Sequence, residues 1–168
     1  MNIHCGFVRV SIILLALLPF DGIAQEVPLA RAPAAPPAVD FGFADLMNLL
    51  IQPRHIKLHR AASARHWELA AAESRNLRAG FNRISNHVPK YLGNDVAEVV
   101  RQLFEPHLME MDKAIAAADA KRVAAAYAGL TAACNECHVY MEHPFIVIKV
   151  PEDGGTDAFA DQDFQPHP

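Results

Sequence analysis

The chain has no excess of positive charge and no sign of an enzyme's machinery. Its 168 residues carry 15 Lys and Arg against 19 Asp and Glu, a formal net charge of -4. This balance offers no general attraction for nucleic acid or anionic lipid. No nucleophile, acid–base pair or nucleotide-binding loop is visible, so we expect no enzymatic activity. At 52% hydrophobic residues, the chain can bury the core of one compact domain, which excludes wholesale disorder.

A hydrophobic run long enough to cross a membrane is also lacking. Arg9 precedes an apolar run over residues 10–18, which is too short to span a bilayer. Small residues up to Ala24 then form a cleavage site, so residues 1–24 are predicted to be a signal peptide cleaved after Ala24, with a periplasmic product. An uncleaved membrane anchor is the alternative, which Pro19 disfavours because it ends the run early.

Cysteine is scarce, and its placement is specific. Once Cys5 is removed with the signal peptide, Cys134 and Cys137 remain, and His138 follows directly. Cys-x-x-Cys-His is the attachment pattern of c-type haem, and an export signal is its required context. Residues i and i+3 share a helix face, so both thiols can bond to the two vinyl groups on one porphyrin edge. The sequence predicts one covalent haem c on Cys134 and Cys137, with His138 as the proximal iron ligand.

Two other interpretations of this cysteine pair stay open. A thiol–disulfide switch prefers a βαβ context, and a zinc site prefers a second ligand pair of similar spacing. The sequence shows neither feature, so both interpretations are disfavoured.

Hydrophobic spacing predicts an all-α domain over residues 40–143. We expect a first helix from Asp40 to about residue 60, kinked at Pro53. Residues 61–63 are expected to turn the chain, with Ser63 as the N-cap of the next helix.

The later helices show regular apolar stripes. The second carries Trp67, Ala70, Ser74, Leu77, Phe81 and Ile84 at steps of three and four. Residues 85–94 break the pattern before a third helix, bent near Pro106, and Asp119 can cap a fourth. The stripe of the fourth helix is Val123, Tyr127, Leu130, Cys134 and Cys137. Short connections between the helices predict an antiparallel four-helix bundle, with no strand before Pro144.

Two segments flank this domain. Residues 25–39 are rich in Pro and Ala, which is typical of an extended tether. Residues 144–168 form a C-terminal extension that begins with the apolar run 145–148. That run is too short to stand alone, so we expect the extension to pack on the helices as an irregular or strand-like cover over the haem.

A bundle with Cys134, Cys137 and His138 on its last helix resembles the class II c-type cytochromes, the cytochrome c-prime and cytochrome c-556 group. The resemblance covers most of residues 40–166. The matching segments, similar to exported bacterial proteins of the cytochrome c family, are residues 45–47, 52–58, 67–70, 130–135 and 161–164. The resemblance implies one-electron transfer with a redox partner protein in the periplasm, and it leaves a homodimer open.

The sixth position of the iron decides between two functions. At about 1.5 Å per residue along the first helix, Met47 lies near the level of the haem, and His55 lies deeper but is the stronger ligand for ferric iron. Met47 and His55 are therefore alternative distal ligands, and either would suit electron transfer. An open face lined by apolar residues such as Leu46, Leu50 and Ile51 would instead suit a haem-based binder of nitric oxide or another diatomic gas. Arg54 and Lys57 are expected near the haem propionates.

Overall fold

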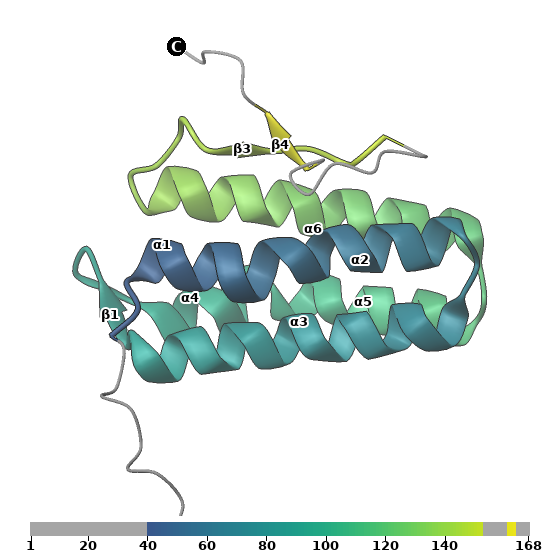
Figure 1. The fold of residues 1–168 in the computed structure, drawn as a ribbon, viewed down its shortest axis with the longest axis horizontal. Coiled ribbons are helices and arrows are strands. Elements are labelled where there is room, and N and C mark those ends of the chain that lie inside the picture. Colours follow the sequence, from purple (N-terminus) through teal and green to yellow (C-terminus); the bar gives the residue numbers. More distant parts are fainter. Residues whose placement is uncertain (1–39, 153–160, 164–168) are drawn as a thin grey trace, which may run out of the picture. The chain divides into compact units, whose positions relative to one another are not determined.

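In the computed structural model, residues 40–152 and 161–163 are described, and they are mostly helical (Figure 1). The helices are α1 (Phe43–Leu46), the π-helix η1 (Met47–Ile51), α2 (Gln52–Ser63), α3 (Trp67–His87), α4 (Val96–Leu103), α5 (Glu105–Ala116) and α6 (Ala120–Tyr140). The strands are β1 (Lys90–Tyr91), β2 (Asn94–Asp95), β3 (Val147–Ile148) and β4 (Gln162–Asp163). The all-α prediction is confirmed. The predicted signal peptide and tether, residues 1–39, lie outside the described residues.

The long helical segments lie side by side around one core (Figure 1). The continuous stretch from α1 to α2 packs on α3 and α6, and α5 packs on α3 and α6 as well. Within the described residues 40–152, no helix is both long and apolar enough to span a bilayer.

The apolar stripes that were read from the sequence form this core. On α3 the buried members are Ala70, Ser74, Leu77, Phe81 and Ile84, and on α6 they are Val123, Tyr127, Leu130, Cys134 and Cys137. The helix break expected near Pro106 is also present, because α4 ends at Leu103 and α5 begins at Glu105.

The helix ends confirm one predicted cap and correct another. Asp119 accepts hydrogen bonds from the backbone N–H groups at the start of α6, as predicted. Ser63 is not an N-cap, because it is the last residue of α2. The chain then turns at Arg65, which adopts a left-handed backbone (φ 56°). The N-cap of α3 is His66, whose Nδ1 accepts from the N–H of Leu69 at 3.2 Å. Ala61 and Ala62 lie within the expected turn and are strong helix formers, which explains the longer α2.

The kink expected at Pro53 takes the form of a π-turn. The N–H of Gln52 donates to the carbonyl of Met47, five residues earlier, so the turn before Pro53 is widened. Proline has no N–H to donate to the carbonyl of Leu49, and its ring crowds that carbonyl in a regular α-helix. The wider turn relieves this conflict without breaking the helical stretch.

A small hairpin corrects the prediction of no strand before Pro144. β1 pairs with β2 in antiparallel fashion through a two-residue loop, Leu92 and Gly93. Both loop residues have positive φ, 48° and 81°, as a type I′ hairpin turn requires. In the sequence, Gly93 signals this turn, because glycine adopts a positive φ without strain, whereas Leu92 gives no such signal.

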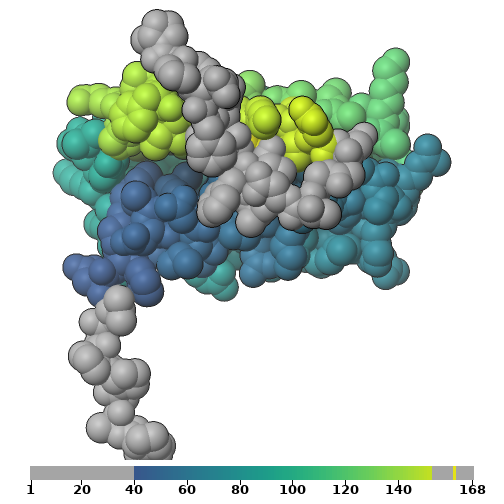
Figure 2. Space-filling view, turned by 45° about the horizontal axis from the view of Figure 1, so that its top comes forward, coloured from purple at the N-terminus to yellow at the C-terminus, as the bar shows by residue number. Residues whose placement is uncertain are grey.

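The described part of the C-terminal extension packs on α6. β3 pairs with β4 in antiparallel fashion, with Ile148 opposite Gln162. The yellow-green residues of the extension lie against the green residues of α6 and the blue residues of the first helical stretch (Figure 2). This is the strand-like form that was expected. Residues 153–160, which include Asp153 and Asp157, lie outside the described residues.

Candidate functional site

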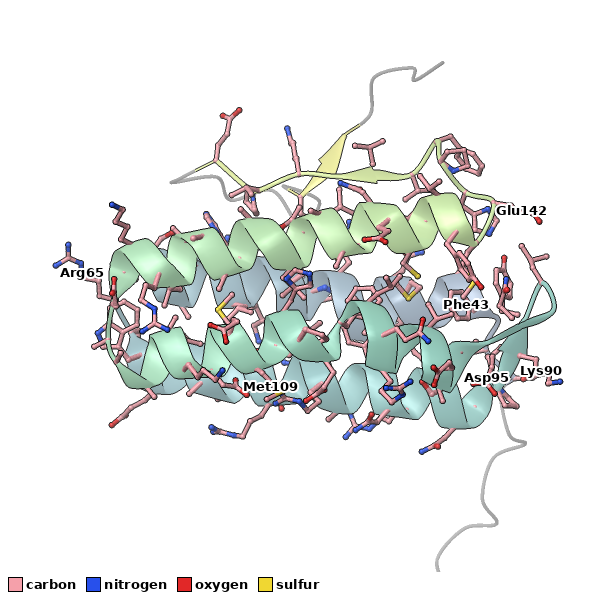
Figure 3. The ribbon with its side chains drawn as sticks, turned by 180° about the vertical axis from the view of Figure 1, so that it is seen from behind. Phe43, Arg65, Lys90, Asp95, Met109 and Glu142 are labelled. Atoms are coloured by element: carbon pink, nitrogen blue, oxygen red, sulfur yellow. The ribbon has the colours of Figure 1, made fainter. Side chains whose placement is uncertain are left out.

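A cavity of about 340 Å³ lies at one end of the helices, where α6 ends and α1 begins. Phe43, at the start of the first helical stretch, and Glu142, just after α6, mark this end in Figure 3, and Arg65 marks the opposite end. The cavity wall is mostly apolar and comes from α1 to α2, from β1, from α6 and from the extension.

The π-turn keeps one side of the first helical stretch on the cavity. Phe43, Met47, Ile51 and His55 all line it, at steps of four residues. In a regular α-helix with 3.6 residues per turn, such a row drifts around the axis. Because a π-turn holds more residues, η1 reduces the drift and leaves Met47 and His55 facing the same space.

The structure brings Cys134 and His138 to this cavity. Cys137 is buried one turn further along α6, outside the cavity lining, and neither cysteine forms a disulfide. Burial raises the pKa of Cys134 to about 12 and that of Cys137 to about 11. Reactive thiols have a lowered pKa, so this environment disfavours the thiol–disulfide switch.

Nδ1 of His138 is committed to a hydrogen bond, whereas Nε2 has no hydrogen-bond partner among residues 40–152 and 161–163. Nδ1 lies 2.7 Å from the carbonyl oxygen of Ile146. Because a carbonyl only accepts, Nδ1 carries the proton and Nε2 keeps its lone pair. Burial lowers the pKa of His138, which favours this neutral form. A neutral imidazole with one bonded N–H is the form in which histidine binds a metal.

The extension is fastened to α6 beside this histidine. Asn135 Oδ1 accepts from the N–H of Ile148 at 2.7 Å, and Asn135 Nδ2 donates to the carbonyl of Ile148 at 2.8 Å. Sequence reasoning missed this role, since a single Asn inside the motif gives no sign of a partner 13 residues away.

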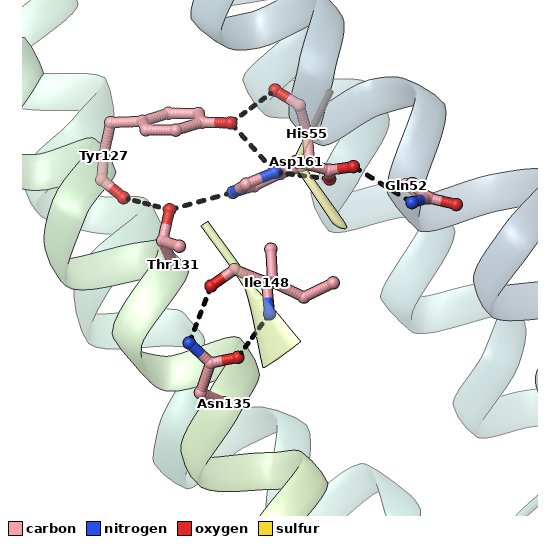
Figure 4. Close-up of polar contacts among 7 residues, drawn as sticks. All are labelled: Gln52, His55, Tyr127, Thr131, Asn135, Ile148 and Asp161. Atoms are coloured by element: carbon pink, nitrogen blue, oxygen red, sulfur yellow. Dashed lines mark hydrogen bonds and ion pairs between the residues drawn. The ribbon is translucent and has the colours of Figure 1, made fainter. Parts of the chain in front are cut away.

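His55 lies in a buried network at the inner wall of the cavity (Figure 4). Its Nδ1 is 2.9 Å from Asp161 Oδ2 and 2.8 Å from the hydroxyl of Tyr127, and its Nε2 is 3.1 Å from the hydroxyl of Thr131. Gln52 donates to the other oxygen of Asp161 at 3.0 Å. Both His55 and Asp161 are only 1% exposed.

The hydrogen bonds of this network bear on whether His55 can bind iron. The hydroxyl of Thr131 donates to the carbonyl of Tyr127, and the hydroxyl of Tyr127 donates to the carbonyl of His55. The carboxylate of Asp161 only accepts, so Nδ1 of His55 donates to it, and Nε2 of His55 lies against the hydroxyl of Thr131. Both ring nitrogens of His55 are thus engaged by neighbouring side chains, which leaves neither of them directed at a bound iron. The expectation of His55 as an alternative distal ligand does not fit this arrangement, whereas Met47 is half-buried and lines the cavity.

The two basic residues expected near the propionates lie elsewhere. Arg54 Nη1 is 3.2 Å from Glu73 Oε2, and Lys57 Nζ is 3.7 Å from Glu73 Oε1. Neither basic residue lines the cavity. Because Glu73 is buried on α3, these two cations neutralise a charge between helices instead.

A metal ion held by side chains alone has no candidate site in the part of the chain that the structure describes. Residues 40–152 and 161–163 contain no group of three or more His, Cys, Asp and Glu side chains arranged to hold an ion. A haem iron needs one or two protein ligands, so this finding bears on a zinc site and not on haem. Comparison of the chain with protein-family models, curated proteins and solved structures gives no match.

Proposed function

We propose that the protein is a periplasmic monohaem c-type cytochrome that carries single electrons. The observation that supports this most is the meeting of Cys134 and His138 at one mostly apolar cavity, with Nε2 of His138 left free of hydrogen bonds from the described residues. An apolar wall suits the faces of a porphyrin, and a thiol at the wall suits its covalent attachment.

Four helical segments are proposed to form an antiparallel four-helix bundle with the haem c at its open end. They are the stretch from α1 to α2, then α3, then α4 with α5, and α6. Bound there, the haem iron would cycle between its ferric and ferrous states. Cys134 and Cys137 would hold the haem, and His138 would be the proximal ligand. Met47 would be the distal ligand, since its thioether is the soft ligand present on the cavity wall. The extension would exclude water from one side of the cavity.

Covalent attachment is tested by haem staining after denaturing electrophoresis. Wild-type protein from cells that contain the haem-attachment machinery is expected to stain, and the double variant Cys134→Ala, Cys137→Ala is expected not to stain. Cys5→Ala is the matched control, because Cys5 lies in the predicted signal peptide and its loss should leave staining intact. A wild-type band without haem would overturn the proposal.

The proximal ligand is tested by comparing two histidines of the same cavity. His138→Ala is expected to change the absorption spectrum far more than His143→Ala, because a haem held by Cys134 and Cys137 keeps only the adjacent histidine in reach. His143 instead contacts the hydroxyl of Tyr91 at 2.7 Å. An unchanged spectrum in His138→Ala contradicts the assignment.

The spectrum of the reduced protein with and without carbon monoxide separates the two functions. A low-spin spectrum that the gas does not change supports electron transfer with Met47 bound. A high-spin spectrum that shifts supports the alternative, a haem-based binder of nitric oxide or another diatomic gas. The redox partner protein, periplasmic export with cleavage after Ala24, and a homodimer also remain proposals.

A further inference from the structure

We infer that Asn135 is a positioning residue for the proximal ligand, acting through the backbone of the extension. This inference rests on the proposed function, because it concerns the tuning of a haem bound to His138. Asn135 is one of the two residues between the motif cysteines, and no part of its chemistry is needed for covalent attachment. Its side chain instead holds β3 where the carbonyl of Ile146 meets His138.

The contact of Asn135 with β3 is bidentate. The amide accepts from Ile148 N–H at 2.7 Å and donates to Ile148 C=O at 2.8 Å. In an extended strand, the N–H and C=O of one residue point to the same side, and those of its neighbours point to the other. On that other side, the N–H of Lys149 donates to the carbonyl of Asp161 at 2.7 Å, next to β4. The Asn135 amide therefore occupies the edge of β3 that faces α6, in the way a neighbouring strand would.

Fixing Ile148 also fixes the carbonyl of Ile146. The two residues are separated by Val147 alone, and β3 begins at Val147. The N–H of Ile146 donates to the carbonyl of His143 at 3.0 Å, which fixes Ile146 from the N-terminal side. Between these two anchors, the carbonyl of Ile146 reaches Nδ1 of His138 at 2.7 Å. A short segment held at both ends gives this acceptor a defined position.

The acceptor controls the electronic character of His138. A hydrogen bond from Nδ1–H to a carbonyl fixes the ring orientation and raises the basicity of Nε2. A more basic ligand stabilises ferric over ferrous iron, so it lowers the reduction potential. Asn135 thus links the extension to the potential of the cofactor, although it is not itself one of the residues that line the cavity.

The test compares Asn135→Ala with Val139→Ala in the full-length protein with haem attached. Val139 is 63% exposed and adjoins His138 on α6, and neither substitution changes the charge. Asn135→Ala is expected to retain covalent haem, to shift the midpoint potential to a more positive value, and to lower the iron–histidine stretching frequency of the five-coordinate ferrous form, which is measured in a Met47→Leu background. Hydrogen exchange at the Ile148 amide should accelerate at least tenfold, roughly the effect of losing one anchoring bond. Val139→Ala should leave all three unchanged.

Asn135→Asp provides a second variant in case alanine weakens the fold. The carboxylate still accepts from Ile148 N–H but cannot donate to its carbonyl, so an intermediate iron–histidine frequency and an intermediate exchange rate are expected. If both Asn135 variants match Val139→Ala in potential, frequency and exchange, the inference is overturned while the proposed function stands. If the wild type carries no haem, the proposed function itself has failed.

Discussion

The carboxylate of Asp161 lies 2.9 Å from Nδ1 of His55, although the two residues are 106 positions apart in the chain. This contact joins the extension to the first helical stretch, and the Asn135 contact joins it to α6. The extension is therefore anchored on two helical segments that both contribute to the cavity wall. Its packing depends on a buried pair of polar groups as well as on apolar area.

Asp161→Asn is expected to destabilise the protein by roughly 3 kcal/mol, because it leaves Nδ1 of His55 without its anionic partner in a buried place. Chemical denaturation measures this change as a lower midpoint at an unchanged slope. Glu152→Gln removes a carboxylate from an exposed position of the same extension and should have almost no effect. Equal midpoints for the two variants would show that the buried contact contributes little.

Truncation after His143 removes the carbonyl that faces His138, the partner of Asn135, and Asp161. The truncated protein should be reduced by ascorbate faster than the full chain and should melt at a lower temperature, because one side of the cavity loses its cover. Stopped-flow mixing and thermal unfolding measure the two effects. Truncation after Asp163 keeps every described residue and is the control. If both truncated proteins behave like the full chain, the extension does not cover the cavity.

Sequence reasoning succeeded where the signal is local. The stripe ending in Cys134 and Cys137 repeats every three or four residues, and such a period is set by helix geometry alone. The cap at Asp119 and the break near Pro106 likewise depend on one residue and its neighbours. The meeting of Met47 with His138 at one end followed from helix lengths and an antiparallel order.

Features that depend on distant or competing contacts were missed. Asp161 is one of five acidic residues in the extension, a composition that predicts a solvated stretch, yet it is buried, because His55 and Gln52 offer it hydrogen bonds that only the folded chain assembles. The left-handed residue Arg65, two positions after the end of α2, was missed because such a conformation is signalled mainly by Gly or Asn.

Helix α5 ends in the same way, which leads to a stability prediction. Ala118 has φ 51°, and the N–H of Asp119 donates to the carbonyl of Ala114 at 3.2 Å across this turn. A left-handed conformation costs an L-residue about 1 kcal/mol and costs glycine almost nothing. Ala118→Gly should therefore raise the free energy of unfolding by roughly 1 kcal/mol, which corresponds to a melting temperature a few degrees higher. Ala117→Gly, one residue earlier at an ordinary φ of -80°, should give no gain. A gain of the same size at both positions would contradict the explanation.

Met47→Leu tests the distal side of the cavity with little change in volume. If the thioether binds iron, its loss converts a low-spin spectrum to a high-spin one, admits carbon monoxide, and lowers the midpoint potential, since a thioether favours ferrous iron. Ile51→Leu is the control, because Ile51 lines the same cavity one turn further along and carries no ligand atom. It should leave spin state and potential near those of the wild type. If Met47→Leu also leaves the spectrum unchanged, Met47 is an ordinary wall residue and gas binding at an open face becomes the better account.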